Sequence, residues 1–375
     1  MTEFRATSGN HTRVGVLFGG RSSECEVSFA TGRYVLNLID TRRFRATPLY
    51  MDPQGRIWKI PPKLVIMNCT ADVNVALEKL GERIPYEELS SHVDVIFNAL
   101  LGKYGEDGAV QGLLGLLKIP FTGSGILPSA VAMNKRATKE LLRAAGYKVA
   151  KDVMIGEKVW NSPGAKTSIF ALVSKELSLP VVVKPVAEGS SVGVGVARDE
   201  KSFYQAVEEA LRWDSEIVVE EFVRGREFMC IVYGLEKSIA MQPSEVEFQG
   251  DIFTYEAKYM PGRALYHTPI RAPLEKREEI QRISESLSKL FGLKGYGRVD
   301  GFLTEAGDVI VSEVHTGTIM VPSSYVFQQA SLQSDPKAQT QQAALKTKGG
   351  SSFNPRTFIT QILDYASETV ERTVS

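Results

Sequence analysis

Near the start of the chain, from residue 14, a short apolar run leads directly into a glycine turn and then into a helical pattern. Residues 14–18 (VGVLF) are followed by GGRSSE and by an apolar-periodic stretch that reaches Leu38. A buried strand, a glycine turn and a helix in that order are typical of an α/β unit. Strand patterns recur at residues 93–99 and 181–185, each close to glycine-rich sequence. The sequence therefore predicts an α/β fold built from three such units.

The length of the chain indicates more than one domain. Its 375 residues exceed the roughly 100 to 200 that one core usually serves. The turn TGSG closes the first unit, and the run IVVEEFV ends the second. We therefore predict an N-terminal α/β domain, a central domain and a C-terminal domain, with the boundaries 1–125, 126–222 and 223–375.

Two helical patterns and one irregular segment stand out between the strands. Residues 130–146 (AVAMNKRATKELLRAAG) read as one helix with Gly146 in the position of a C-cap, and residues 275–291 form a second helical pattern. The segment 156–168 is polar and contains Pro163 and Gly164. Because such composition is typical of loops, we predict a surface insertion there.

Composition narrows the class of protein and its surroundings. Hydrophobic residues make up 43% and charged residues 23%, and 44 basic side chains balance 44 acidic ones. This argues against disorder and predicts neither nucleic acid nor a membrane as partner. The three cysteines, Cys25, Cys69 and Cys230, show no CxxC spacing. With no apolar leader and no run of about 18 apolar residues, these features predict a cytoplasmic protein.

Two lysines and one glycine-rich loop could hold phosphate. Lys184 follows a β run and precedes residues 186–196 (VAEGSSVGVGV), where small residues let backbone N–H groups approach phosphate oxygens. A flexible hairpin turn would show the same composition. Lys135, within MNKR, is a second candidate. A solvent-facing helix lysine is the plainer interpretation of Lys135.

The end of the chain's last strand pattern could hold a metal ion. In residues 310–315 (IVSEVH), Glu313 and His315 share a face because side chains alternate along a strand, and Asp300 follows Arg298 in the preceding strand. Carboxylates on adjacent strands suit Mg²⁺. Strand-end carboxylates satisfied by Arg298 are the alternative. Lysines, a glycine loop and paired carboxylates in this order together favour a Mg-ATP site.

A set of ordered motifs resembles one enzyme family. GGRSSECEVS, NALLGKYGEDGAVQGLL, IPFTGSG, MNKRATKELL, LPVVVKPVAEGSSVGV, YEAKY and GRVDGFL are similar to those of D-alanine–D-alanine ligases of the ATP-grasp superfamily. The resemblance implies three α/β domains with ATP between the second and third. It also implies that ATP phosphorylates one D-alanine, that the amine of a second attacks the acyl phosphate, and that the dipeptide enters peptidoglycan synthesis. We further expect a homodimer.

The resemblance assigns nucleotide contacts residue by residue. Lys135, Lys184 and Lys258 resemble the lysines that reach the phosphates, and Glu220 and Glu227 resemble the acids at adenine and ribose. The loop that covers the phosphates is matched by Glu188, Gly189, Ser190 and Ser191.

The amino-acid and metal contacts are assigned in the same way. Glu24 resembles the residue that holds the ammonium of the first D-alanine, and Arg298 the guanidinium that steadies the tetrahedral intermediate. Tyr259 matches a position that distinguishes dipeptide formers. The resemblance implies Glu24, Ser190, Tyr259 and Arg298 as the catalytic set. The Mg²⁺ or Mn²⁺ ligands it implies are Asp300, Glu313 and, in place of the usual asparagine, His315.

Three departures from the family pattern lie around the acceptor. His315 stands where the family has asparagine, Thr318 and Ile319 replace a Pro-Gly pair, and Leu101 replaces a histidine. Imidazole shifts metal preference toward Mn²⁺ or Zn²⁺, and Leu101 can neither donate a hydrogen bond nor titrate.

These departures leave three functions open. The first is a D-alanine–D-alanine ligase. The second is an ATP-grasp ligase recruited to another carboxylate or nucleophile in a specialised pathway. The third is a degenerate paralogue that binds nucleotide and catalyses little.

Overall fold

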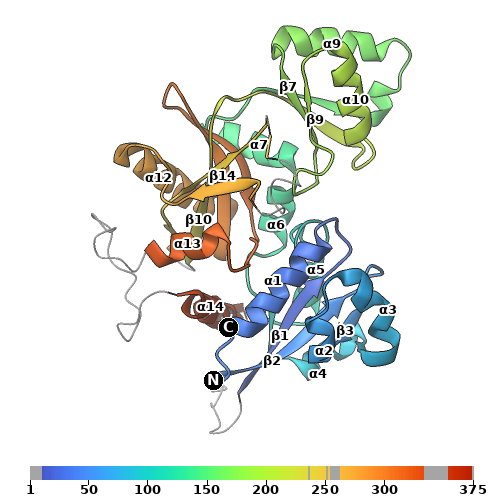
Figure 1. Cartoon of the computed structure of the whole chain (residues 1–375), viewed down its shortest axis with the longest axis vertical. Helices are drawn as coiled ribbons and strands as arrows, with labels where there is room; N and C mark the ends of the chain where they lie inside the picture. The colour runs from blue at the N-terminus through green and yellow to red at the C-terminus, as the bar shows by residue number, and fades with distance from the viewer. Residues whose placement is uncertain (1–10, 235–236, 251, 254–261, 333–353, 374–375) are drawn as a thin grey trace.

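The computed structural model describes residues 11–234, 237–250, 252–253, 262–332 and 354–373. Three sheets follow one another along the chain, and helices pack against each of them (Figure 1). The predicted α/β class is confirmed. In the part of the chain that the structure describes, no helix combines the length and apolar content needed to cross a bilayer.

The N-terminal sheet has the strand order β4-β3-β2-β1-β5. The inner strand β1 runs parallel to both neighbours, and its last six residues are buried. Val16 and Phe18 enter one core cluster and Leu17 enters another, as alternation in a sheet covered on both faces requires. The strands are β1 (Thr12–Gly19), β2 (Phe44–Met51), β3 (Ile57–Lys59), β4 (Glu82–Ile84) and β5 (Val95–Asn98).

The helices of this part follow the strands closely in sequence. Helix α1 begins directly after the predicted glycine turn, so that Glu24 is its N-cap residue. The helical segments are α1 (Cys25–Leu38), α2 (Pro62–Val65), α3 (Thr70–Leu80), the 3-10 turn η1 (Tyr86–Glu88), α4 (Leu89–His92) and α5 (Ala109–Leu116).

The central sheet has four antiparallel strands in the order β6-β9-β7-β8. They are β6 (Asp152–Gly156), β7 (Val181–Pro185), β8 (Gly195–Ala197) and β9 (Glu216–Glu221), with helices α8 (Glu157–Trp160), α9 (Ala165–Glu176) and α10 (Glu200–Ala210). The segment 156–168 lies at the surface as predicted, because most of its residues are exposed, but it is not an irregular loop, since α8 and the start of α9 occupy it. Trp160, only 1% exposed, anchors them, with its ring centroid 6.0 Å from that of Phe203.

The C-terminal sheet has the order β13-β12-β10-β14-β15, and β11 pairs with β10. Helix α12 (Leu274–Phe291) confirms the pattern seen at 275–291. The strands are β10 (Gly225–Gly234), β11 (Ile239–Ala240), β12 (Ser244–Phe248), β13 (Ala264–His267), β14 (Gly295–Thr304) and β15 (Val309–His315), and helix α13 (Tyr325–Leu332) follows them.

The helix predicted over 130–146 is broken at Asn134. Helix α6 (Ile126–Met133) ends there and α7 (Lys135–Ala144) begins, because the Asn134 side chain accepts a hydrogen bond from the Ala137 N–H at 3.0 Å. Gly146 has φ of +82°, as a C-cap requires. Both helices pack against β15. The predicted boundaries 1–125, 126–222 and 223–375 stay a prediction.

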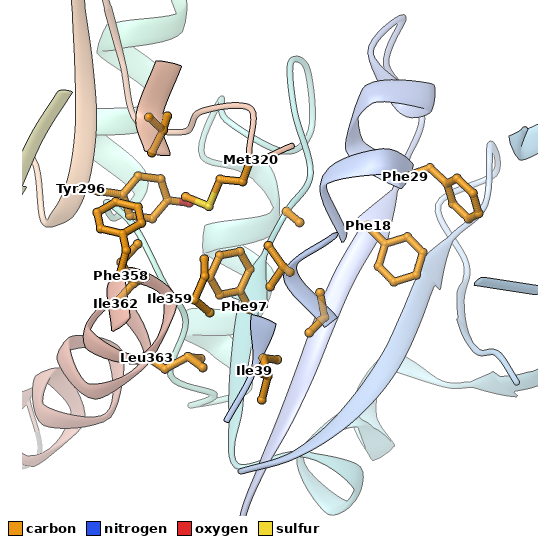
Figure 2. Packing of buried hydrophobic residues seen from close by; sticks show 14 of the residues in the cluster. Phe18, Phe29, Ile39, Phe97, Tyr296, Met320, Phe358, Ile359, Ile362 and Leu363 are labelled. Carbon is orange, nitrogen blue, oxygen red and sulfur yellow. The ribbon is translucent and has the colours of Figure 1, made fainter. Parts of the chain in front are cut away.

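Helix α14 (Pro355–Thr373) joins the C-terminal sheet to the N-terminal one. Figure 2 shows its residues Phe358, Ile359, Ile362 and Leu363 turned toward Phe97 of β5 and Tyr296 of β14. All four of these α14 side chains are at most 1% exposed. This core fixes the end of β15 close to the N-terminal sheet.

Candidate active site

A cavity of about 550 Å³ lies among the three sheets. Its wall contains the glycine-rich loop, strands β9, β10, β14 and β15, and three residues of the N-terminal part, Glu24, Leu101 and Glu106. Every predicted site residue that the structure describes lines it, and Lys258 and Tyr259 lie outside the described residues.

The break between α6 and α7 aims Lys135 into the cavity. Its backbone N–H donates to Val186 O at 2.9 Å, and its Nζ donates to Glu188 O at 2.6 Å. The same Nζ lies 3.7 Å from Glu313 Oε1. With its side chain 11% exposed, Lys135 is not the solvated helix lysine of the plainer interpretation. It links the glycine loop to the end of β15.

Lys184 on β7 is held by a buried carboxylate on the neighbouring strand. Its Nζ lies 2.8 Å from Glu220 Oε2. Burial lowers the pKa of Lys184, but Glu220 and Glu313 outweigh it and raise that pKa to about 12. Burial raises the pKa of Glu220, but Lys184 and Lys139 outweigh it and lower that pKa to about 2. The Lys184 ammonium therefore stays charged inside the cavity.

Lys139 is a cavity residue that sequence reasoning missed. Its Nζ lies 2.6 Å from Glu220 Oε1 and 3.4 Å from Asp152 Oδ1, and its side chain is 2% exposed. Arg143 also pairs with Asp152. Lys139 follows Lys135 by four residues on α7, which places both on one helix face. That spacing was the signal available in the sequence.

The glycine-rich loop is tied to the N-terminal part of the chain. Glu188 Oε1 forms a salt bridge with Lys103 Nζ at 2.6 Å, and the Ser190 hydroxyl donates a hydrogen bond to the Glu24 carboxylate. Ser190 and Ser191 have φ of 47° and 59°, a conformation that non-glycine residues seldom adopt. The Ser191 hydroxyl donates to Phe253 O at 2.7 Å. These contacts hold the loop over the cavity.

Gly189 is where this loop approaches the N-terminal part most closely. A side chain at Gly189 would collide with the carboxylate of Glu24. A residue larger than glycine would therefore displace the Glu24 carboxylate, which is 6% exposed and lies directly beneath the loop.

Strands β14 and β15 bring four predicted residues together. Their register pairs Arg298 with His315 and Asp300 with Glu313, and a bulge follows Asp300. Arg298 Nε donates to both Asp300 oxygens, at 2.8 and 3.0 Å. His315 Nε2 lies 3.3 Å from Asp300 Oδ2 and 3.2 Å from Glu313 Oε2. Arg298 therefore satisfies Asp300, as the alternative interpretation expected, and Glu313 and His315 at the end of β15 join this pair in one charged cluster.

The residues of this cluster stabilise one another's charged forms, as the directions of their pKa shifts indicate. Burial raises the pKa of Glu313, but Lys135 and His315 outweigh it and hold that pKa well below its usual range. Burial and Arg298 lower the pKa of His315, but Asp300 and Glu313 raise it above its usual value. Burial raises the pKa of Asp300 and Arg298 lowers it, with a net decrease.

The residues assigned as metal ligands fit a metal ion only in part. Within the ranges that the structure describes, no group of three or more His, Cys, Asp or Glu is arranged to hold a metal ion. Asp300 and Glu313 are paired with protein cations instead. The donor chemistry does fit, because two carboxylates suit Mg²⁺ and an imidazole suits Mn²⁺ or Zn²⁺. His315 Nε2 is buried, aims between the carboxylates and has no well-aligned hydrogen bond to a described residue.

The cavity wall also contains Leu101, Thr318 and Ile319, three of the residues that depart from the family pattern. Leu101 and Thr318 are each 4% exposed, and Ile319 lines the wall beside them. Glu227 lines the wall on β10. Tyr325, which the sequence analysis did not single out, also lies here, and its hydroxyl accepts a hydrogen bond from Arg298 Nη1 at 2.6 Å.

The cavity lies between an antiparallel four-stranded sheet and a larger sheet, and it contains buried lysines, a glycine loop and paired carboxylates. This combination is that of an ATP-grasp ligase. The family D-ala D-ala ligase N-terminus matches residues 13–124, and the family D-ala D-ala ligase C-terminus matches residues 141–333. The chain therefore belongs to the D-alanine–D-alanine ligase family, whose members are ATP-dependent ligases.

Individual relatives agree with this family. A D-alanine–D-alanine ligase of Geobacillus thermodenitrificans is 35% identical over 84% of this chain and 88% of its own length. D-alanine–D-alanine ligase A of Chromobacterium violaceum is 37% identical over 81% of this chain and 86% of its own length. The structure of VanG D-Ala:D-Ser ligase from Enterococcus faecalis is similar with a TM-score of 0.77 at 26% identity, over 95% of this chain and all of that one.

The fold itself extends over nearly the whole chain. The structure of the D-alanine–D-alanine ligase from Coxiella burnetii matches with a TM-score of 0.76 at 24% identity and covers 97% of this chain and 96% of that one. The ATP-grasp architecture predicted from the sequence is thereby confirmed.

Proposed function

We propose that this protein joins two D-alanine molecules at the expense of ATP, through an acyl phosphate. The convergence of Lys135, Lys184, the glycine loop, Glu24 and Arg298 in one cavity carries the proposal. A volume of about 550 Å³ lies within the range of cavities that hold small-molecule ligands. Membership of an ATP-dependent ligase family supports it.

In the first step, a carboxylate oxygen of one D-alanine attacks the γ-phosphorus of ATP, and ADP leaves. Phosphoryl transfer depends mainly on positioning and charge neutralisation. The Nζ atoms of Lys135 and Lys184 would supply positive charge, and the glycine-rich loop, which lines the same cavity, would donate backbone N–H groups to phosphate oxygens. Glu24 would hold the ammonium of this first D-alanine, because its carboxylate faces the cavity beneath Ser190.

In the second step, the amine of the other D-alanine attacks the acyl carbon, phosphate leaves, and the amine loses a proton. Negative charge develops on the carbonyl oxygen as the tetrahedral intermediate forms. Arg298 lines the cavity from β14 and would supply a guanidinium to this oxygen. A preorganised cation there lowers the barrier more than water could.

We propose Mg²⁺ or Mn²⁺ as the cofactor. Asp300 and Glu313 would hold the ion, and His315 would be a third ligand. When bound, the ion neutralises phosphate charge, and this chain's residues orient the reacting groups around it.

We also propose the remaining features of the biology. A D-alanine dipeptide suits peptidoglycan precursor synthesis in the cytoplasm. A homodimer would cover the exposed apolar side chains of α5 and α6, where Leu116 is 86%, Leu127 is 73% and Ile126 is 56% exposed.

A second candidate function rests on the acceptor side. Leu101, Thr318 and Ile319 replace family residues beside the attacking amine. A ligase recruited to another amine nucleophile would retain the nucleotide contacts and change this wall, as this chain does.

Release of ADP and formation of dipeptide test both functions. The purified protein is assayed with ATP, Mg²⁺ or Mn²⁺, and a panel of D- and L-amino acids, singly and in pairs. Dipeptide with D-alanine alone supports the first function, and turnover only with another acceptor supports the second. Nucleotide binding without ADP release on any amino acid would contradict both and indicate the degenerate paralogue.

A further inference from the structure

The guanidinium of Arg298 is held at two separate points. Asp300 accepts both hydrogen bonds from Nε, and the Tyr325 hydroxyl accepts one from Nη1 at 2.6 Å. Among the described residues, none is hydrogen-bonded to Nη2. Because guanidinium is planar, fixing Nε and Nη1 fixes the direction of Nη2 as well. Arg298 lines the cavity in this orientation.

Tyr325 is itself rigidly placed. Its side chain is 4% exposed, its ring centroid lies 5.5 Å from that of Tyr266, and its hydroxyl lies 3.3 Å from Thr318 Oγ1. A buried tyrosine with a packed ring and hydroxyl partners on two sides has little freedom to move.

Helix α13 carries Tyr325 and is pinned to the strand behind Arg298. Gln329, fully buried, accepts from the Ile231 N–H at 3.0 Å and donates to Met229 O at 2.8 Å. In the register of the sheet, Ile231 is opposite Arg298 and Met229 is opposite Asp300. The same segment of β10 therefore fixes the positions of both the helix that carries Tyr325 and the strand that carries Arg298.

We propose that Tyr325 is a positioning residue for the amide-forming step, which keeps the Arg298 guanidinium directed at the carbonyl oxygen that becomes negative. This inference rests on the proposed function. Tyr325 acts only through Arg298. A guanidinium anchored at Asp300 alone could turn about the Cδ–Nε bond. Attack by the amine would then be slower, and more of the acyl phosphate would be hydrolysed by water.

The test is the Tyr325→Phe variant, which keeps the ring and removes the hydroxyl. We expect kcat for dipeptide formation to fall about tenfold, while the KM for ATP is unchanged. The ratio of ADP released to dipeptide formed should rise severalfold, because phosphorylation continues and capture by the amine is impaired. A merely structural loss would lower both products together and leave that ratio unchanged.

Two further variants sharpen the test. Tyr34→Phe removes a hydroxyl from a ring that packs on α13, 5.6 Å from Phe327, outside the cavity wall. It should leave kcat and the ratio unchanged. Thr318→Val removes the second partner of the Tyr325 hydroxyl and should raise the ratio by a smaller factor.

The outcomes separate this inference from the function beneath it. If wild type forms dipeptide and Tyr325→Phe retains the wild-type ratio of ADP to dipeptide, the positioning role is wrong and the ligase function stands. If wild type forms no dipeptide from D-alanine, the proposed function itself fails before Tyr325 is tested. Equal effects in Tyr34→Phe and Tyr325→Phe would also overturn the inference.

Discussion

The two sides of the cavity differ in how their charges are arranged. On the nucleotide side, Lys139 and Lys184 share the two oxygens of Glu220 at 2.6 and 2.8 Å, and all three side chains are at most 13% exposed. On the other side, Arg298 and Asp300 of β14 and Glu313 and His315 at the end of β15 carry charge, and the wall beyond them includes Glu106 and the apolar Leu101 and Ile319.

This difference matches the two kinds of work. Phosphate charge is the same in every ATP-dependent reaction, so a buried and mutually paired set of lysines serves any acceptor. Recognition of the attacking amine depends on the substrate, and the departures from the family pattern are all found on that side. Under the proposed function, the cavity would combine a general nucleotide side with a substrate-specific acceptor side.

The largest expected effect comes from removing a lysine of the nucleotide side. Lys184→Ala eliminates a cation that acts most strongly as charge moves onto the transferred group. Turnover measured by ADP release should fall by two or more orders of magnitude, about 3 kcal/mol or more. Lys148→Ala removes an exposed lysine paired with Asp308 and should be neutral. Unchanged ADP release in Lys184→Ala would show that the nucleotide side does not depend on this charge.

A second effect of similar size concerns stability at low pH. Glu220 has a pKa of about 2 in the folded protein against an ordinary value of 4.5. Its contribution is therefore complete above pH 4.5 and is lost as pH falls toward 2. At about 1.36 kcal/mol per pKa unit, this difference corresponds to roughly 3 kcal/mol of unfolding free energy.

Urea unfolding between pH 7 and pH 3 measures this contribution. Glu220→Gln should lower stability at pH 7 and flatten its decline with acid, because the neutral amide has no proton to gain. Glu208→Gln, which alters an exposed pair with Lys166, should retain the wild-type slope. A wild-type slope in Glu220→Gln would mean that another carboxylate governs the decline.

Local patterns and the family resemblance indicated which residues share the cavity, but not the residues that hold them in place. Strand alternation placed Glu313 with His315, and the glycine loop located Lys184 and Ser190, because each depends on neighbours in sequence. Lys139 and Tyr325 were missed, since what defines them is a contact with Glu220 or Arg298 far along the chain.

The fold shows the same limit. The strands at 14–18, 93–99, 181–185 and 310–315 and the helix at 275–291 follow from periodicity. The break at Asn134 does not, because one capping hydrogen bond interrupts a pattern that is otherwise continuous. Burial of Trp160 anchors the polar segment 156–168 to the central part of the structure. Helix α14 packs on a sheet that lies more than 200 residues earlier in the chain. Long-range packing of this kind leaves no local signature.

The next prediction concerns the boundary between the two sides. Glu24→Gln keeps an acceptor for the Ser190 hydroxyl and removes the negative charge that would hold an ammonium. The KM for the first amino acid should rise about tenfold, roughly 1.4 kcal/mol, with ATP affinity unchanged. Glu26→Gln on the same helix, where the carboxylate binds Thr70 N at 2.9 Å, is the matched control. A collapse of ATP affinity would make Glu24 a support of the loop.

The smallest expected effect is at His315, where the charged cluster and the acceptor wall meet. If the imidazole ligates the ion, His315→Asn exchanges a nitrogen ligand for an oxygen and should lower the ratio of Mn²⁺- to Mg²⁺-supported turnover severalfold. Direct Mn²⁺ binding in the absence of substrate should weaken in parallel. His92→Asn, on the surface helix α4, should change neither measurement. The competing possibility is that Nε2 only pairs with Asp300 and Glu313, at 3.3 and 3.2 Å, and that the two carboxylates hold the ion alone. Asparagine would then preserve both the metal ratio and the Mn²⁺ affinity, and the acceptor side would differ from the family in its apolar wall but not in its metal chemistry.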